Sequence, residues 1–300
     1  MKILLTGSSG FLGKEIQQNV NEDIELSRLS RSSGDILCDL SKSIPLLKDN
    51  IDRVVHSAGL AHVFGKKNSD AFYKVNVLGT VNLLKGLERN ATLPKEIIFI
   101  SSVSVYGLEK GVLISEENSL VAQDPYGKSK IAAESVLLKW CKENNVNLII
   151  LRLPLIVGHN APGNLGKMTR GIQNRRYFSI GDGKVKKSMV LAKDVAQLCT
   201  RKDLTPGIFN LTDGFHPTFR ELEQAISNKF NKPMPIVLPI RLAIILAFIG
   251  DVLNKFQKGI FPFDSKVLNK ITSELTFDDS KAIRQLGWMP TKVLEIYKND

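Results

Sequence analysis

A tyrosine and a lysine four positions apart, Tyr126 and Lys130, are the residues best suited to move a proton. On a helix this spacing places both side chains on one face. A lysine ammonium there favours the tyrosinate and lowers a phenol pKa that is otherwise about 10. The pair can then act as a general acid and base toward a hydroxyl or a ketone. Ser101 and Ser102, at the end of an apolar run, supply hydroxyls that can orient the substrate oxygen.

A glycine-rich segment near the N-terminus suits a phosphate ligand. Thr6-Gly7-Ser8-Ser9-Gly10-Phe11-Leu12-Gly13 follows a predicted strand and precedes a predicted amphipathic helix. The first glycine allows a tight turn, the second lets the backbone approach a pyrophosphate, and the third lets helix and strand pack closely. The helix N-terminus adds free N–H donors. We therefore expect a dinucleotide cofactor to contact Gly7, Ser9, Gly10, Phe11, Leu12 and Gly13.

The end of the second predicted strand, 24–29, bears on which dinucleotide binds. An acidic residue is usual there in NAD sites, but this chain has Arg28 and Arg31. An arginine suits a 2′-phosphate, so NADP(H) is favoured slightly over NAD(H), unless both arginines are only solvated surface. Asp39, followed by Leu40, stands where a third strand would end. It can accept from the adenine amine, or cap a helix.

The elements that position these residues alternate along the first half of the chain. Apolar runs predict strands, and periodic stretches predict helices. Strands are expected over 3–5, 24–29, 54–56, 97–101 and 148–151, and helices over 12–20, 70–89 and 128–142. The alternation predicts an α/β fold with a Rossmann-type, doubly wound parallel sheet and a ligand at the carboxyl ends of its strands.

The second half of the chain is less regular. A loop is expected over 158–166, helices over 190–200 and 219–230, and a strand over 207–211 that returns to the main sheet. We therefore predict an NAD(P)-binding Rossmann domain over 1–158, with roughly 187–212 returning to it. A smaller, partly discontinuous substrate domain is expected from roughly 159–186 and 213–300.

Composition narrows the class of protein. The 300 residues are 43% hydrophobic and 24% charged, as in ordinary soluble proteins. The net charge of +11 fits either an anionic ligand such as a nucleotide or a generally basic surface. Lysine and arginine are dispersed, which argues against nucleic-acid binding. Three widely spaced cysteines indicate reduced thiols of a cytoplasmic protein, with no disulfide frame and no metal site.

The longest apolar stretch, Ile236–Ile249, is interrupted by Pro239 and Arg241. It is too short to span a bilayer, so we expect no membrane span. A buried helix is the expected structure, and contact of the 236–256 segment with a membrane surface is the alternative. At the N-terminus, the first strand runs directly into Gly7 and leaves no room for the apolar region of a signal peptide.

Five motifs together resemble the extended short-chain dehydrogenase/reductases, specifically their nucleotide-sugar epimerase/dehydratase group. In chain order they are Thr6 to Gly13, His56-Ser57-Ala58-Gly59, Val75-Asn76-Val77-Leu78-Gly79-Thr80, Ser101-Ser102-Val103-Ser104-Val105-Tyr106-Gly107 and Tyr126-x-x-x-Lys130. The likeness continues through Gly181-Asp182-Gly183, Lys193-Asp194-Val195-Ala196 and Leu286-Gly287-Trp288, so it covers nearly the whole chain.

The resemblance implies a role for individual residues. Ser102 would orient the substrate, Tyr126 would be the acid and base, and Lys130 would assist it and bind the nicotinamide ribose. Further cofactor contacts would come from Ala58, Gly59 and Asn76, and substrate contacts from Asn164, Leu165 and Lys187. Lys187 stands where many relatives have arginine, and a lysine meets a phosphate only as a point charge. His56 is expected to pack in the core.

The activity implied is NAD(P)-dependent oxidation or reduction at C4 of a nucleotide-linked hexose in surface-polysaccharide biosynthesis, with a UDP-sugar as the favoured substrate. A 4-epimerase and a 4-keto-sugar reductase share the same proton and hydride step, and the two arginines lean slightly toward the reductase. Ser102-Val103-Ser104 lacks the adjacent acidic pair of a dehydratase. Reduction of a non-sugar ketone and a non-catalytic cofactor-binding role are the alternatives. The resemblance also implies a homodimer.

Overall fold

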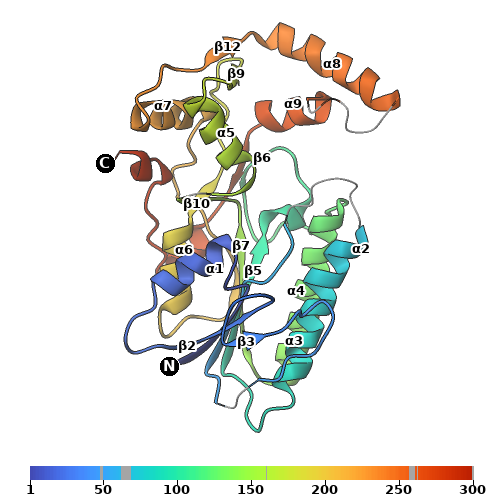
Figure 1. Ribbon diagram of the computed structural model, residues 1–300, viewed down its shortest axis with the longest axis vertical. Helices are drawn as coiled ribbons and strands as arrows, with labels where there is room; N and C mark the ends of the chain where they lie inside the picture. The colour runs from blue at the N-terminus through green and yellow to red at the C-terminus, as the bar shows by residue number, and fades with distance from the viewer. Residues whose placement is uncertain (48–49, 62–68, 160, 257–260, 262, 299–300) are drawn as a thin grey trace.

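The computed structural model describes residues 1–47, 50–61, 69–159, 161–256, 261 and 263–298. Its centre is a seven-stranded sheet in the order β11-β7-β5-β4-β1-β2-β3 (Figure 1), in which every pair of neighbours is parallel. The strands are β1 (Lys2–Thr6), β2 (Glu25–Ser30), β3 (Ile36–Leu37), β4 (Arg53–His56), β5 (Glu96–Ser102), β7 (Asn147–Leu153) and β11 (Gly207–Asn210). The strand order reverses between β1 and β4, which is where doubly wound sheets bind ligands.

Helices cover both faces of this sheet, as predicted. The long helices are α1 (Phe11–Gln18), α3 (Gly79–Leu87), α4 (Pro125–Glu143), α5 (Gly163–Gln173), α6 (Ala192–Thr200), α7 (Phe219–Lys229), α8 (Ile240–Phe256) and α9 (Ser265–Thr272). Buried residues of α1, α6 and the short α10 (Ser280–Leu286) pack on one face, and those of α3 and α4 pack on the other. Because both faces are covered, the central strands β1, β5 and β7 are nearly continuous apolar runs.

The remaining strands form three parallel pairs beside the main sheet. They are β8 (Leu155–Val157) with β10 (Met189–Leu191), β9 (Phe178–Ile180) with β12 (Ile236–Leu238), and β6 (Gly111–Ile114) with β13 (Leu275–Phe277). A third core cluster joins α5, α7 and the C-terminal turn Val293–Tyr297. These elements and α8 lie at the far end of the molecule from the chain's N-terminus (Figure 1).

Several predicted boundaries change. The helix expected over 190–200 begins at Ala192, because the apolar residues before it form β10. The loop expected over 158–166 ends where α5 begins at Gly163, and its residue 160 lies outside the described residues. The stretch 70–89 consists of α2 (Ser69–Phe72), a π-helical segment (Tyr73–Leu78) and α3. A π-helical turn often marks a functional site.

The expectation of a buried helix at Ile236–Ile249 is wrong. Within α8 the buried residues are Ala243, Ala247 and Gly250. The large aliphatic and aromatic side chains of the helix face outward, with Phe248 65% exposed and Ile245 55% exposed. These three small residues are four and three positions apart and therefore lie on one narrow face of the helix, and the neighbouring elements contact only that face. Among the described residues, no helix has the length and apolarity needed to cross a bilayer.

Candidate active site

The glycine-rich turn lies between β1 and α1 and is closed by backbone contacts. Gly7 has φ +71, and a Cβ atom there would lie 2.6 Å from the Ala58 nitrogen. A Cβ on Gly13 would lie 2.2 Å from the Gly7 oxygen. Gly10 is the N-cap of α1, and no side chain caps this end of the helix. The N–H groups of the first turn are therefore available to an acceptor from outside the chain. The turn therefore has the shape and the donors that a pyrophosphate requires.

Side chains around the turn fit the same purpose. The Ser30 hydroxyl, at the end of β2, donates to the Ser9 hydroxyl over 3.2 Å. The Ser8 hydroxyl is buried and has no hydrogen-bond partner among the described residues. Leu12 is buried in the core, and Phe11 packs against both neighbouring clusters. Leu12 therefore meets a cofactor only through its backbone.

The two arginines considered for the 2′-phosphate differ. Arg28 is held by Asp35, with Nη2 to Oδ1 at 2.9 Å and Nε to Oδ2 at 3.0 Å. This pairing lowers the pKa of Asp35 to about 2. Arg31 is exposed and directly follows Ser30. A hydrogen bond from Ser41 is the main reason that the pKa of Asp39 is lowered, and the nearby charge of Arg31 adds to this effect. Arg31 is thus the arginine beside the glycine-rich turn.

His56 connects this turn to the helix behind it. The Ala58 N–H donates to the Thr6 hydroxyl over 3.1 Å, and that hydroxyl donates to His56 Nδ1 over 2.7 Å. The Thr80 hydroxyl donates to the Asn76 carbonyl, so it accepts from His56 Nε2–H over 2.9 Å. Burial, together with the nearby positive charge of Lys130, lowers the pKa of His56 to about 3. His56 is therefore a neutral structural residue, as expected.

This histidine makes stability depend on pH. In the unfolded chain this histidine binds a proton near pH 6.5, but in the folded protein it does not do so until about pH 3. Its contribution to the unfolding free energy is therefore complete above pH 6.5 and is lost as the pH falls toward 3. Between pH 6.5 and about 5, we expect wild type to lose about 1 to 2 kcal/mol more unfolding free energy than His56→Gln. Urea unfolding at both pH values measures this difference. Equal losses would contradict the assignment.

The predicted catalytic residues come together at the carboxyl end of β5. Ser102 is its last residue, and Asp124 caps α4 by accepting from the Tyr126 and Gly127 N–H groups, which places Tyr126 in the first turn. A hydrogen bond joins the side chains of Tyr126 and Ser102. The Tyr126 ring packs 5.9 Å from the ring of Phe72. A hydroxyl and a phenol thus face the same space.

Lys130 is nearly fully buried in the next turn of α4. Its Nζ donates to the Ile100 carbonyl over 2.8 Å and lies 4.6 Å above the Phe99 ring. A Cβ on Gly59 would lie 3.3 Å from this Nζ and 3.3 Å from Asn76 Oδ1. The open backbone of Gly59 therefore leaves room beside the ammonium, close to the glycine-rich turn that Ala58 contacts.

The pKa values at this pair differ from the expectation. Burial raises the pKa of Tyr126, and the hydrogen bond from Ser102 only partly opposes it. Burial lowers the pKa of Lys130 to about 8, against the attraction of Glu134. The prediction that Lys130 lowers the Tyr126 pKa below its usual value is therefore wrong, because the loss of solvent outweighs the favourable groups. Tyr126 is a neutral phenol that can donate a proton.

Asn76 lies in the π-helical segment and ties three elements together. Its Oδ1 accepts from the Leu60 N–H over 2.7 Å, and its Nδ2 donates to the Leu60 carbonyl and to the Ser129 hydroxyl. The Ser129 hydroxyl donates in turn to the Tyr126 carbonyl over 2.7 Å. Asn76 thereby fixes the loop after β4 against the turn that carries Tyr126.

A buried ion pair beneath the site was not anticipated. Glu134 accepts from the Ser101 hydroxyl and pairs with Arg152, with Nη2 to Oε2 at 2.7 Å. Arg152 Nη1 donates to the Tyr106 hydroxyl over 3.1 Å. Glu134 lies four residues after Lys130 on α4, so both side chains are on one face of the helix. This spacing was the sequence signal that Glu134 lies near the site. The network holds the end of β5, where Ser102 is located.

Removing one charge of this pair is expected to be costly. Glu134→Gln leaves the Arg152 guanidinium buried without a counter-charge, which should lower the unfolding free energy by about 3 to 5 kcal/mol. Glu143→Gln on the same helix is the matched control, because its pair with Lys139 is exposed. We expect less than about 0.5 kcal/mol from that change. Denaturant unfolding of both variants makes the comparison, and similar losses would contradict it.

The residues predicted to contact substrate lie around α5 and β10. Asn164 is exposed in the first turn of α5, but Leu165 is buried in the third core cluster. Only the Leu165 backbone is therefore available to a ligand. Lys187 is half-buried, and burial lowers its pKa to about 8 in spite of the attraction of Glu274. A desolvated lysine of this kind is well suited to meet a phosphate.

Comparison with known proteins agrees with this geometry. Residues 3–210 match the family model described as NAD dependent epimerase/dehydratase family. The chain belongs to this family. The predicted fold and enzyme class, an NAD(P)-dependent epimerase-type enzyme of the extended short-chain dehydrogenase/reductases, are thereby confirmed.

Individual relatives cover almost the entire chain. N-acetyl-alpha-D-glucosaminyl-diphospho-ditrans,octacis-undecaprenol 4-epimerase of Escherichia coli O157:H7 is 27% identical over 93% of this chain and 88% of its own length. UDP-glucose 4-epimerase of Vibrio cholerae is 26% identical over 98% of this chain and 92% of its own. The structure of UDP-glucose 4-epimerase with UDP-glucose from Thermotoga maritima superposes with a TM-score of 0.75 at 20% identity, covering 99% and 96% of the two chains. The last likeness concerns the fold.

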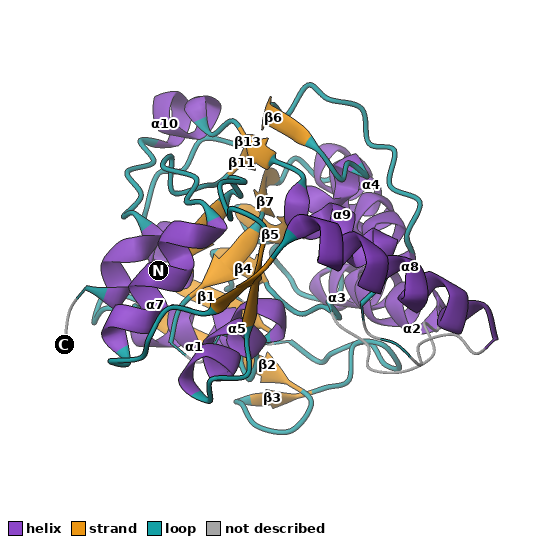
Figure 2. Cartoon of the chain, turned by 90° about the horizontal axis from the view of Figure 1, so that it is seen from above, coloured by secondary structure: helices purple, strands orange, loops and turns teal. Residues whose placement is uncertain are grey.

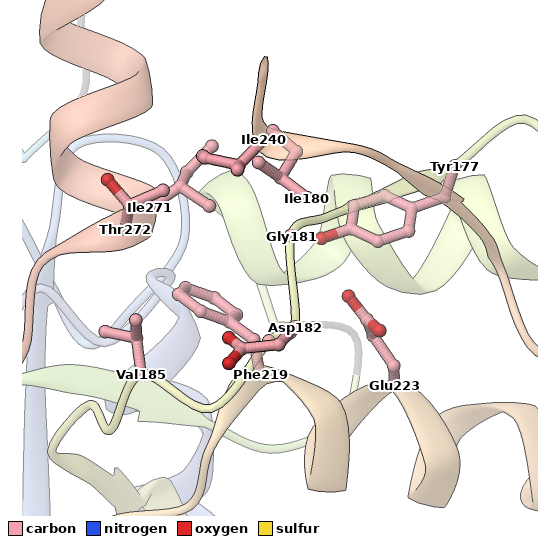
Figure 3. Close-up of a pocket in the computed structure, with 11 residues that line it drawn as sticks. Tyr177, Ile180, Gly181, Asp182, Val185, Phe219, Glu223, Ile240, Ile271 and Thr272 are labelled. Carbon is pink, nitrogen blue, oxygen red and sulfur yellow. The ribbon is translucent and has the colours of Figure 1, made fainter. Parts of the chain in front are cut away.

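A cavity of about 370 Å³ in this family member was missed by the sequence analysis (Figure 3). It is lined by residues of β9, α7, α8 and α9, and the Tyr177 hydroxyl and the Glu223 carboxyl face it. Burial raises the pKa of both groups. The sequence signal for Glu223 was a charge on the apolar side of α7, next to Leu222 and one turn before Ile226.

Proposed function

We propose that this protein is an NAD(P)-dependent 4-epimerase of a diphosphate-linked hexose. The observation that carries the proposal is the convergence of Ser102, Tyr126 and Lys130 at the carboxyl end of β5, beside Gly59 and the glycine-rich turn. Both curated relatives described above carry 4-epimerase names. For comparison, a reductase would draw on the same residues but would consume its cofactor.

The residues present fit a nicotinamide dinucleotide. The pyrophosphate would lie on the first-turn N–H groups of α1, with Gly7, Ser9, Gly10 and Gly13 around it. Lys130 and Asn76 would flank the nicotinamide half near Gly59, and Asp39 and Leu40 the adenine. When bound, the nicotinamide would supply the reversible acceptance of hydride that a change of configuration at C4 requires.

The chain's own residues supply the proton chemistry. Ser102 orients the C4 oxygen through its hydroxyl. Tyr126, after losing its own proton, takes the proton from that oxygen as a phenolate and later returns it. The raised pKa of Tyr126 makes its phenolate a strong base toward that proton. The buried ammonium of Lys130, one turn along α4, is the charge that would balance the phenolate. Lys187, Asn164 and the Leu165 backbone would hold the diphosphate of the substrate.

NADP(H) is the favoured cofactor, but on different grounds from those of the sequence. Arg28 is occupied by Asp35, so the preference rests on Arg31. We expect Arg31→Ala to weaken NADP+ binding about tenfold to a hundredfold, since a hydrogen bond to a charged group contributes about 1.5 to 3 kcal/mol. NAD+ binding should be nearly unchanged. Calorimetric titration with both cofactors measures this, and equal losses would exclude Arg31 from the 2′-phosphate site.

The substrate class is tested by stabilisation and product analysis. A bound substrate raises the melting temperature by mass action, so UDP-glucose and UDP-N-acetylglucosamine should each be compared with the free sugars. The expected product is the C4 epimer, with no net change in the nicotinamide. Consumption of NADPH in proportion to product would replace the epimerase by the 4-keto-sugar reductase. No stabilisation by any UDP-sugar would favour a lipid-diphosphate sugar as substrate, tested next.

The remaining expectations stay predictions. They are a homodimer, a cytoplasmic location, and a substrate-binding part made of roughly 159–186 and 213–300.

A further inference from the structure

The outward face of α8 is the largest apolar feature that the proposed function leaves unused. Its central side chains are Ile244, Ile245, Phe248 and Ile249, which are 44% to 65% exposed. The adjoining strand β12 adds Ile236, which is 72% exposed. Single exposed apolar residues are common on protein surfaces, but a continuous row along a 17-residue helix is characteristic of an interaction surface.

The opposite face of α8 is already occupied. Ala243 and Ala247 pack with Leu268 of α9 in a small core cluster, and Asn254 bonds to the Phe261 backbone. The one acidic residue of the helix, Asp251, accepts hydrogen bonds from Ser265 at the start of α9. Figure 2 shows α8 at the edge of the molecule with α9 on its inner side. The apolar face therefore points away from the protein.

Charge on this face is positive. At 100° per residue, Arg241 and Lys255 fall in the same sector as Phe248, one near each end of the helix. Both side chains are exposed, as are Lys266 and Lys270 of α9. The protein as a whole carries +11. An apolar centre flanked by cations is complementary to an anionic lipid surface.

A second copy of the chain fits this face less well. Two such helices related by a two-fold axis and running antiparallel would bring Arg241 of one near Lys255 of the other. A parallel pairing would align each cation with its own counterpart. Both arrangements oppose like charges at the ends of an apolar contact. The helix is also too short for the ~20 residues that cross a bilayer core, so it would lie in the interface plane.

We propose that α8 docks this protein on the surface of an anionic lipid bilayer, with its apolar face in the boundary between headgroups and acyl chains. Phe248, Ile245 and Ile249 enter the apolar layer, and Arg241 and Lys255 reach the phosphates. Ile240, the first residue of α8, also lines the cavity of Figure 3. Docking thus places this cavity close to the membrane. The inference does not depend on the proposed catalysis.

Sedimentation with vesicles tests it. Full-length protein is mixed with vesicles of phosphatidylcholine alone, or of equal parts phosphatidylcholine and phosphatidylglycerol. Wild type should pellet with the anionic vesicles. Phe248→Glu should weaken this binding roughly tenfold to a hundredfold through lost apolar contact. Arg241→Glu combined with Lys255→Glu should weaken it roughly tenfold or more. The control Met289→Glu changes an apolar residue that is 88% exposed elsewhere, and should bind as wild type does.

Each variant is first shown to unfold at the wild-type temperature, so that loss of binding is not loss of fold. Failure of the wild type to pellet with anionic vesicles would overturn the proposal. A second outcome would also overturn it: the wild type forms an oligomer in solution, does not bind vesicles, and becomes monomeric when Phe248→Glu is introduced. The apolar face would then be a protein interface. Binding equal for Met289→Glu and Phe248→Glu would also overturn it.

Discussion

Replacing Tyr126 with phenylalanine should reduce turnover by about 10² to 10⁴, the range that general acid–base catalysis supplies. The phenol is the group that meets Ser102 at the end of β5, and its removal leaves no proton carrier at the C4 oxygen. The aromatic ring and its contact with Phe72 remain, so the fold and the binding of cofactor should be unchanged. Steady-state rates of C4 epimer formation, with calorimetric titration of the cofactor, measure both effects.

Tyr73→Phe is the matched control for that experiment. Tyr73 begins the π-helical segment and is 52% exposed, so losing its hydroxyl should leave turnover within about twofold of wild type, as for most surface changes. Equal turnover of Tyr126→Phe and wild type would remove Tyr126 from the chemistry.

Replacing Gly13 with alanine should separate the cofactor from the protein. The new Cβ would lie 2.2 Å from the Gly7 oxygen and 2.8 Å from the Ser8 Cα, so α1 must move away from the turn. Overpacking of this kind should lower the unfolding free energy by about 1 to 3 kcal/mol. Displaced N–H donors should weaken cofactor binding about tenfold to a hundredfold, since each charge-assisted hydrogen bond contributes about 1.5 to 3 kcal/mol.

Gly79→Ala is the control for this change. Gly79 has φ −59, and its Cβ would meet Leu40 at 3.6 Å, an ordinary contact. The variant should bind cofactor as wild type does and be equally stable or up to about 1 kcal/mol more stable. If Gly13→Ala bound cofactor with wild-type affinity in calorimetric titration, the glycine-rich turn would not be the pyrophosphate site.

The doubly wound parallel sheet and the glycine-rich turn were predictable because each depends on local patterns. Apolar runs and helical periods repeat along 1–158, and the rule for right-handed crossovers leaves few ways to assemble them. The function of Gly7, Gly10 and Gly13 could be predicted from residue type, because the close backbone contacts at these positions leave no room for a Cβ atom.

Features that depend on contacts between distant residues were not predictable in the same way. Arg28 was a candidate ligand for the 2′-phosphate, but the return of the chain into β3 places Asp35 against it. The direction of the Tyr126 pKa shift depends on how much solvent the folded chain excludes, which the spacing of Tyr126 and Lys130 does not contain. Only their shared helix face was visible in the sequence.

The misjudged helix α8 shows a second limit. Hydrophobic composition predicted burial, and burial is the common outcome for such a stretch. The small residues Ala243, Ala247 and Gly250 form the stripe that packs, so the larger side chains are left outside. An apolar helix whose small residues share one face can therefore be packed through that face alone.

The central claim is that this chain oxidises the sugar transiently at C4 and returns the same hydride to the other face. The most direct test incubates the protein with UDP-N-acetylglucosamine carrying deuterium at C4 and analyses the product by mass spectrometry and NMR. The account predicts the C4 epimer with its deuterium retained at C4 and the nicotinamide unchanged at the end. An epimer in which solvent hydrogen has replaced the deuterium at C4 would contradict it.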